Sequence, residues 1–195
     1  MDAMSSPISR FRSHRSPVVA RHGMVATSQP LAAQAGLRVL QAGGNAADAA
    51  VVTATVLNVV EPMSTGAGGD AFALVRWANE KQVRALNGSG RAPGAADAEA
   101  LRARGWKEIP DNSPFAITVP GSVDAWYQLL SSYGTLSWEE ALRPAIQYAE
   151  VGFPVSPMIA RQWHDLAGRL RDNEEGVLAY LDRGAAPRAG QIFRQ

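Results

Sequence analysis

The chain has 195 residues, of which 46% are hydrophobic, so it is long and apolar enough to fold around one core. Charged residues make up 19% and the formal net charge is +1, so no strong field draws the protein to nucleic acid or to an anionic membrane. The sequence has no cysteine, which excludes disulfides, thiol nucleophiles, iron–sulfur clusters and cysteine-type zinc sites. We therefore expect one globular domain without nucleic-acid or membrane partners.

Residues 1–22 form a basic N-terminal stretch, which we interpret as a flexible arm. Its arginines are Arg10, Arg12, Arg15 and Arg21, and its only acid is Asp2. A secretory signal needs an uninterrupted apolar stretch after its positive charges, and polar residues and a proline occupy that place at 13–17. The longest apolar run, residues 46–60, is shorter than the roughly 20 residues that span a bilayer. The sequence thus predicts a cytoplasmic protein.

Two helices are predicted in the first third of the chain. Ser28 is a natural N-cap, and apolar residues then recur at the spacing of one helix face until the glycine pair at 43–44. Asn45 can cap a second helix, with Asp48 near the positive end of its dipole. Residues 46–60 are apolar all round, which predicts a helix that is covered on most sides.

The remaining elements mix strands and helices. Residues 71–77 and 82–86 have the pattern of two strands joined by a polar turn, which predicts a β-hairpin. Short strands are also predicted at residues 24–26, 115–119 and 191–193. Helices are predicted to start near four residues, Asp97, Ser122, Ser137 and Ser156. This order is typical of a mixed α/β fold.

The glycine-rich loop at 64–70 is the first candidate for chemistry, because residues 66–71 fit the loose dinucleotide pattern G-x-G-x-x-[GA]. That fingerprint needs a strand before the glycines and a helix after them, so that the helix N-terminus meets the pyrophosphate. Here a helix precedes and a strand follows. The simpler interpretation is that glycine lets the backbone turn sharply or pass close to another segment. A non-catalytic globular module that binds a partner or nucleotide through such loops is the alternative function.

Other sites have little support in the residue pattern. The histidines, His14, His22 and His164, are too far apart for a recognised ligand pair, and no G-x-S-x-G nucleophile elbow occurs. Arg91 lies in the segment NGSGRAP at 87–93, where a guanidinium between flexible glycines and a rigid proline could hold a carboxylate by two parallel hydrogen bonds. A solvated surface arginine is the alternative.

Five short motifs follow one another along the chain: GMVA at 23–26, GGNAADAA at 43–50, EPMSTGAGGDAF at 61–72, VPGS at 119–122 and EVGF at 150–153. In this order and at this spacing they resemble the N-terminal part of the γ-glutamyltranspeptidase family. Each motif alone is weak, and the series makes the resemblance specific. Residues 23–195 are thus identified as the N-terminal portion of a γ-glutamyltranspeptidase-like large subunit, a fragment of a longer precursor.

The resemblance implies an α/β fold of the four-layer αββα type of N-terminal-nucleophile hydrolases, present here only in part. It also implies a precursor that cleaves itself into a large and a small chain. In such enzymes the threonine exposed at the start of the small chain attacks the γ-glutamyl carbonyl of glutathione or a related amide, and its own α-amine serves as base. The implied partners are this small-molecule amide and the small catalytic subunit. No metal or organic cofactor is implied.

This sequence departs from the family pattern at two points. The nucleophilic threonine stands in a Thr-Thr/Ser-His context, which none of the six threonines here has, so we expect no catalytic residue in this chain and no activity from it alone. The arginine that holds the substrate α-carboxylate lies in an Arg-Glu-x-Ala-Pro segment. Aligning Ala-Pro places Ser89 at that position and Arg91 two residues later. Ser89 and Arg91 are therefore the predicted substrate-binding residues, and we expect donors other than glutamyl amides.

Overall fold

The computed structural model describes residues 16–110 and 113–195. Of the predicted N-terminal arm, Arg10, Arg12 and Arg15 lie outside the described residues. Residues 16–22 are exposed and form no helix or strand. The flexibility of the arm stays a prediction.

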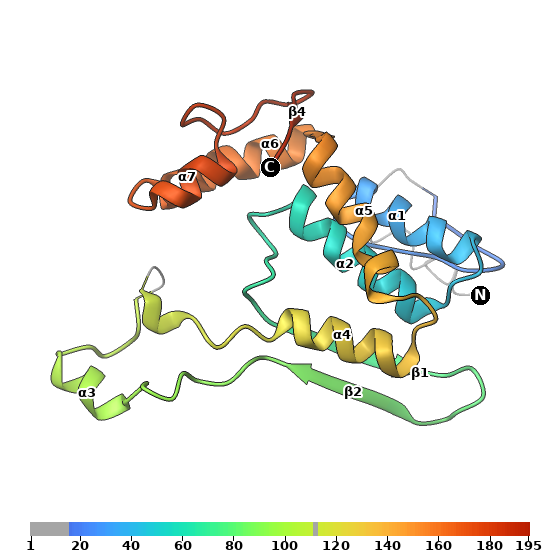
Figure 1. Ribbon diagram of the computed structural model, residues 1–195, viewed down its shortest axis with the longest axis horizontal. Helices are drawn as coiled ribbons and strands as arrows, with labels where there is room; N and C mark the ends of the chain where they lie inside the picture. Colours follow the sequence, from blue (N-terminus) through green and yellow to red (C-terminus); the bar gives the residue numbers. More distant parts are fainter. Residues whose placement is uncertain (1–15, 111–112) are drawn as a thin grey trace, which may run out of the picture.

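The first two helices, α1 (Pro30–Gln41) and α2 (Ala46–Val60), pack side by side (Figure 1). The N-cap of α1 is Gln29, whose side-chain oxygen accepts from the first backbone N–H groups of the helix. The prediction of Ser28 as N-cap is wrong, because the Ser28 hydroxyl instead donates to the carboxylate of Glu61, at 2.6 Å. This bond ties the start of α1 to the end of α2.

Helix α2 is the buried centre of the helical layer. It begins with the predicted pair, Asn45 and Asp48, which form a capping box. Helices α1, α4 (Ser122–Tyr133) and α5 (Trp138–Val151) all pack against it. Four valines of α2 have no exposed surface: Val51, Val52, Val56 and Val60. The prediction that this helix is covered on most sides is confirmed, and this chain itself supplies the cover.

Asp48 joins the start of α2 to the turn between α4 and α5. Its fully buried carboxylate accepts from Asn45 N (2.8 Å), Thr135 N (2.7 Å), Thr135 Oγ1 (2.8 Å) and Leu136 N (3.0 Å). Burial raises the pKa of this carboxyl, but the hydrogen bonds from Leu136, Asn45 and Thr135 outweigh burial and hold the pKa below its ordinary value of 3.8. Asp48 is therefore charged at neutral pH, and it fixes the α4–α5 turn on α2.

The predicted hairpin is present as β1 (Ala71–Arg76) paired antiparallel with β2 (Val83–Gly88). Helix α4 packs on both strands and runs alongside them in Figure 1. Because side chains alternate between the two faces of a strand, every second β1 residue is half-buried and the others, Phe72, Leu74 and Arg76, are exposed. The hairpin has one covered face and one open face.

The other helix starts agree with the sequence. Asp97 caps α3 (Ala98–Ala103), and Ser137 forms a capping box with Glu140 at the start of α5. Ser156 caps α6 (Pro157–Leu166). The predicted helix starts are confirmed because each depends on a side chain and a backbone N–H only two or three residues apart.

Two predicted strands are absent from the described residues. At 115–119, Ser113 caps a single 3-10 turn, η2 (Pro114–Ala116), and the only strand-like contact after it is the bond from Val119 N to Arg91 O, at 2.9 Å. At 24–26, Val25 lies against the helix α1 at Gly36 instead of against a strand. Both segments have the composition of a strand but no neighbouring strand with which to form a ladder.

The C-terminal part lies on the far side of the helical layer from the hairpin (Figure 1), and its buried side chains, among them Phe153 and Trp163, belong to the same hydrophobic core as the buried valines of α2. The strands β3 (Phe153–Pro154) and β4 (Ile192–Phe193) pair antiparallel, which confirms the strand predicted at 191–193. Between them lie α6 and two short helices, η3 (Ala167–Leu170) and α7 (Glu174–Tyr180). The Trp163 and Phe193 rings meet edge to face with centroids 4.8 Å apart.

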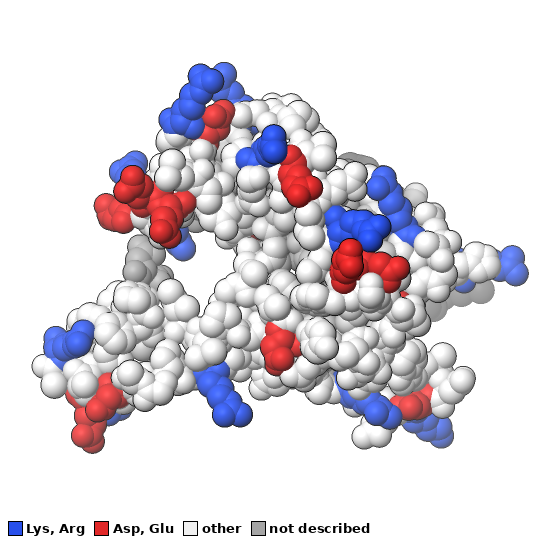
Figure 2. Space-filling model, viewed as in Figure 1, with Lys and Arg blue, Asp and Glu red and all other residues white. Residues whose placement is uncertain are grey.

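Charge distribution and helix length give little information about partners or location. On the face shown in Figure 2, lysine and arginine lie among aspartate and glutamate without a large patch of one sign. No helix of the described residues is long and apolar enough to cross a membrane. The predicted cytoplasmic location and the absence of nucleic-acid partners stay predictions.

Candidate functional site

Three segments that are distant in sequence cross where β1 begins, β2 ends and α4 begins. They are the glycine-rich loop at 66–70, the segment 88–91 after β2, and the segment 118–122 before α4. The backbone N–H groups of Gly121 and Ser122 both donate to the carbonyl of Gly69, at 3.1 and 2.9 Å. These donors at the N-terminus of α4 are thus used within the chain rather than for a phosphate.

Glycine makes this crossing possible. A Cβ on Gly121 would lie 2.4 Å from the Gly88 carbonyl oxygen and 2.6 Å from the Gly90 nitrogen. A Cβ on Gly88 would lie 2.5 Å from the Ala125 Cβ. Gly90 also has a φ of +71°, a conformation that favours glycine. The close approach of backbones thus requires glycine at these three positions, all of which lie outside the loop at 64–70.

The glycines of the loop itself are a different case. Around Gly66 and Gly68 a Cβ would meet nothing within 4 Å, and neither residue has a positive φ. No contact with the described residues therefore requires glycine at these two positions. The loop is anchored at its other atoms, since the buried Ser122 hydroxyl lies 2.8 Å from the Ala67 carbonyl oxygen and 3.2 Å from that of Gly66.

The predicted substrate-binding residues lie in this crossing. Ser89 is half-buried, and its N–H donates to Asn87 Oδ1 at 3.0 Å. The Thr118 hydroxyl lies 3.3 Å from the Ser89 carbonyl oxygen and 3.4 Å from Asp70 Oδ1. Arg91 is exposed, and only its carbonyl is held, by Val119 N. Its guanidinium makes no ion pair with another described residue.

The sequence analysis missed the Thr118–Asp70 contact. Asp70 ends the glycine-rich motif and Thr118 lies 48 residues later, so no local pattern connects them. Asp70 lies in the family motif at 61–72, and Thr118 directly precedes the motif at 119–122. The presence of both motifs in one chain was the signal that could have pointed to this contact.

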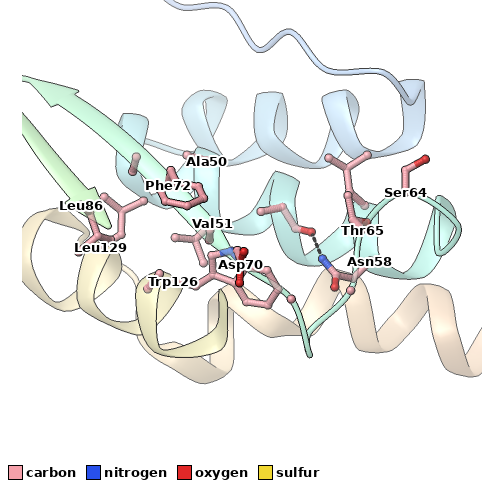
Figure 3. Close-up of a pocket in the computed structure, with 17 residues that line it drawn as sticks. Ala50, Val51, Asn58, Ser64, Thr65, Asp70, Phe72, Leu86, Trp126 and Leu129 are labelled. Carbon is pink, nitrogen blue, oxygen red and sulfur yellow. Dashed lines mark hydrogen bonds between the residues drawn. The ribbon is translucent and has the colours of Figure 1, made fainter. Parts of the chain in front are cut away.

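A cavity of about 370 Å³ lies next to the crossing, between α2, the loop, β1 and α4 (Figure 3). Most of its lining is apolar, with polar groups at Asn58 and in the loop. Asn58 Nδ2 donates to the Ala54 carbonyl at 2.8 Å, whereas Asn58 Oδ1 is buried and has no hydrogen-bond partner among the described residues. Neither Ser89 nor Arg91 lines the cavity.

Outside the backbone crossing, the threonines and histidines of the described residues form no second cluster suited to catalysis or metal binding. Three threonine hydroxyls are committed to structural bonds, from Thr53 to Ala49 O, from Thr55 to Val52 O, and from Thr135 to Asp48. His22 and His164 are exposed, and His14 lies outside the described residues. Within residues 16–110 and 113–195, no three side chains of histidine, aspartate or glutamate gather as metal ligands. That the chain holds no catalytic residue and no cofactor stays a prediction.

A sequence model of the family described as Gamma-glutamyltranspeptidase matches residues 32–195. The chain belongs to the gamma-glutamyltranspeptidase family. It is 40% identical over 179 residues to the glutathione hydrolase-like YwrD proenzyme of Bacillus subtilis (strain 168), a match that covers 91% of this chain and 34% of that protein. The resemblance inferred from the five motifs is confirmed.

Solved structures of this family share the fold of the described residues. The crystal structure of cephalosporin acylase from Bacillus halodurans matches with a TM-score of 0.86 at 45% identity, over 100% of this chain and 37% of that chain. Helicobacter pylori gamma-glutamyltranspeptidase matches with a TM-score of 0.85 at 29% identity, over 92% of this chain and 52% of that chain. The chain spans about a third of the length of the curated relatives it matches first.

Proposed function

We propose that this chain is the N-terminal portion of the large subunit of an enzyme that transfers or hydrolyses an acyl group bound as an amide. Membership of the gamma-glutamyltranspeptidase family carries this proposal. The relatives are named as a glutathione hydrolase-like proenzyme, a cephalosporin acylase and a gamma-glutamyltranspeptidase. The first is a proenzyme by name, which supports a precursor that is processed into two subunits.

The proposed mechanism divides the work between two chains. A threonine at the N-terminus of the small subunit attacks the amide carbonyl, with its own α-amine as base, and preorganised donors stabilise the oxyanion. The amine leaves, and water or a second amine takes the acyl group. No metal or organic cofactor enters these steps. This chain supplies scaffold and one wall of the substrate pocket, because the backbone crossing holds the Ser89–Arg91 segment in place.

The hairpin supports the four-layer αββα arrangement. Its covered face lies on α4, and the helices α2, α1 and α5 continue the layer behind it. On its open face Phe72 and Leu74 are 67% and 78% exposed. An apolar sheet face of this kind is stable when a second sheet packs on it. The remainder of the precursor supplies that second sheet in our proposal.

We also propose that the acyl donor lacks the α-carboxylate of a γ-glutamyl group. Ser89 stands where a carboxylate-binding arginine is expected, and a neutral hydroxyl cannot form the bidentate pair that arginine forms. Arg91 stands two residues later, and Gly90 between them has a φ of +71°, so the Arg91 side chain starts from a different point and in a different direction than a side chain at 89. The higher identity to the cephalosporin acylase than to the H. pylori enzyme supports the same conclusion.

Steady-state kinetics of the complete enzyme test this function. The substrates are γ-glutamyl p-nitroanilide and its analogue without the α-carboxylate, 4-aminobutyryl p-nitroanilide. We expect turnover of the analogue at least equal to that of the γ-glutamyl compound, and no effect of Arg91→Ala on the analogue. Absence of turnover of any acyl anilide by the processed enzyme would contradict the proposed activity.

Specificity for γ-glutamyl donors would give a different kinetic result. If Arg91 holds the carboxylate despite its position, Arg91→Ala lowers kcat/KM for the γ-glutamyl compound by about ten- to a hundredfold, the equivalent of about 1.5–3 kcal/mol for a charge-assisted pair. Arg91→Lys then recovers only part of this loss, because an ammonium lacks the planar fork.

A further inference from the structure

The register of the hairpin leads from its last paired residues directly into the backbone crossing. The ladder ends with Ala71 opposite Gly88, where β1 begins and β2 ends. One step further in the same register, Asp70 stands opposite Ser89. Side chains at directly opposite positions of an antiparallel pair share a face, with Cβ atoms about 4.5–5.5 Å apart. Asp70 is therefore the cross-strand neighbour of position 89.

A side-chain contact supports the same neighbourhood. The Thr118 hydroxyl lies 3.4 Å from Asp70 Oδ1 and 3.3 Å from the Ser89 carbonyl oxygen, so one hydroxyl group reaches both residues. The segment that carries Thr118 is itself held, because Val119 N donates to the Arg91 carbonyl at 2.9 Å. The carboxylate of Asp70 is thus kept beside the Ser89–Arg91 segment by contact as well as by register.

The Asp70 carboxylate has no counter-charge within residues 16–110 and 113–195. Both ion pairs of this part of the chain lie elsewhere, and neither joins Asp70 to Arg91, the cation nearest to position 89 along the chain. Among the described residues only the Thr118 hydroxyl approaches this carboxylate as a donor, at a distance longer than an ordinary O–H···O bond. Asp70 therefore has acceptor capacity left for a cationic or N–H group.

The position of Asp70 on the hairpin decides what can use this capacity. Asp70 precedes Phe72 and Leu74 at steps of two residues, and both of those side chains are exposed on the open face. In the proposed function a second sheet covers this face and removes bulk water from it. A carboxylate taken out of water needs a cation or hydrogen-bond donors in place of its hydration.

We propose that Asp70 is a specificity-determining residue and that the acyl donor carries an ammonium group that binds to it. The inference rests on the proposed function, in which the Ser89–Arg91 segment is one wall of the substrate pocket. An arginine at position 89 would pair with Asp70 across the strands and present a shared charge. With serine there, the acid is the charge that this part of the wall presents, so it attracts an ammonium group and repels a carboxylate.

Four p-nitroanilides of matched chain length test the inference on the complete processed enzyme. The γ-glutamyl compound carries both an ammonium and a carboxylate group, the 4-aminobutyryl compound only the ammonium, the glutaryl compound only the carboxylate, and the butyryl compound neither. We expect kcat/KM for the 4-aminobutyryl compound to exceed that for the glutaryl compound by at least about tenfold, the size of one charge-assisted contact. Equal values, or a preference for the glutaryl compound, overturn the inference.

Asp70→Asn removes the charge and keeps both the size of the side chain and an acceptor oxygen for Thr118. We expect the ratio of kcat/KM between the 4-aminobutyryl and glutaryl compounds to fall by at least about tenfold. Asp165→Asn is the matched control, because Asp165 is an exposed aspartate of α6, on the far side of the helical layer from the hairpin (Figure 1). Its ratio is expected to stay within about twofold of wild type. An equal loss of kcat/KM for all four compounds in Asp70→Asn indicates a structural role and overturns the inference.

Ser89→Arg tests the cross-strand pairing itself. The new guanidinium lies within reach of Asp70, which holds it away from the substrate. Adding Asp70→Asn releases it, so we expect kcat/KM for the glutaryl compound to be at least about tenfold higher in the double variant than in Ser89→Arg alone. Equal values in the two variants overturn the inference. Turnover of the butyryl compound by the wild-type enzyme reports separately on the proposed function, which fails if none of the four compounds is a substrate.

Discussion

Helix α2 and the β1–β2 hairpin lie on either side of one cavity and differ in how completely this chain covers them. Four of the five valines of α2 have no exposed surface, and three helices of the same chain pack against this helix. The hairpin has α4 on one face, an exposed apolar face on the other, and an edge without a partner among the described residues. The chain therefore covers most of its central helix by itself, whereas its hairpin keeps one face and one edge exposed.

This difference assigns separate tasks to the two regions. The α2 layer provides stability within the chain, and the Asp48 carboxylate and the Asn45 amide bind it to the α4–α5 turn. The hairpin exposes one strand edge and one apolar face, on which another chain packs in our proposal, and the Ser89–Arg91 segment directly follows β2. The predictions below separate these tasks.

The largest expected loss of stability comes from Asp48→Ala. It removes four accepted hydrogen bonds and leaves the part-buried N–H groups of Thr135 and Leu136 without their partner, at about 1 kcal/mol for each lost bond. We expect the free energy of unfolding to fall by about 3 kcal/mol or more in urea denaturation. Glu140→Ala is the matched control, because it breaks the exposed capping box of α5. Its loss of about 1 kcal/mol or less is expected to be clearly smaller.

Gly121→Ala tests the backbone crossing. The new Cβ meets the Gly88 carbonyl oxygen at 2.4 Å, so one of the two segments must move. We expect a loss of about 1–3 kcal/mol in unfolding free energy and reduced kcat/KM of the complete enzyme. Gly68→Ala has open space and is expected to stay within about 0.5 kcal/mol of wild type. Equal effects of the two variants would show that the crossing is not close-packed.

Acid sensitivity is expected to depend in part on Asp48. Its pKa in the folded chain lies below 3.8, the ordinary value, so the unfolded chain binds the proton more readily. The stabilisation is complete above the unfolded pKa of about 3.9 and is lost as the pH falls through the folded pKa. We predict that urea unfolding between pH 7 and pH 3 shows a smaller loss of stability on acidification for Asp48→Asn than for wild type. An equal loss of unfolding free energy on acidification in the two proteins would contradict this role of Asp48.

The open face of the hairpin affects association more than stability. We expect the 195-residue chain expressed alone to self-associate through Phe72 and Leu74. The double variant Phe72→Lys with Leu74→Lys is predicted to shift light scattering toward a monomer while the unfolding free energy changes little. Met158→Lys with Leu178→Lys removes two side chains of similar exposure elsewhere and is expected to change neither quantity. If both double variants reduce self-association equally, the hairpin face has no special role in it.

Local patterns predicted the helical layer well. The capping boxes at Asn45 and Ser137 and the apolar run at 46–60 depend on residues close in sequence, and the structure has all three. The hairpin also follows from alternation and a polar turn. The same logic failed at 24–26 and 115–119, because a strand needs a neighbour, and composition does not say whether one is present.

The candidate site was less predictable. Ser89 and Arg91 came from motif alignment, and the structure shows only that their segment is held between two others. The reasons for glycine at 88 and 121 are contacts 33 residues apart in sequence. The partners of Asp48 are 87 and 88 residues away. Each of these contacts forms when distant segments pack, and no local periodicity encodes that packing.

Hydrogen–deuterium exchange tests most directly the central claim that this chain completes α2 but not the hairpin. Peptides covering 51–56 and 71–76 are compared between the complete enzyme and the 195-residue chain at a concentration low enough to prevent association. The account predicts that α2 amides exchange equally slowly in both, and that β1 amides exchange at least about tenfold more slowly in the complete enzyme because a second sheet covers the open face of the hairpin. Equal exchange of β1 in the two proteins would contradict it.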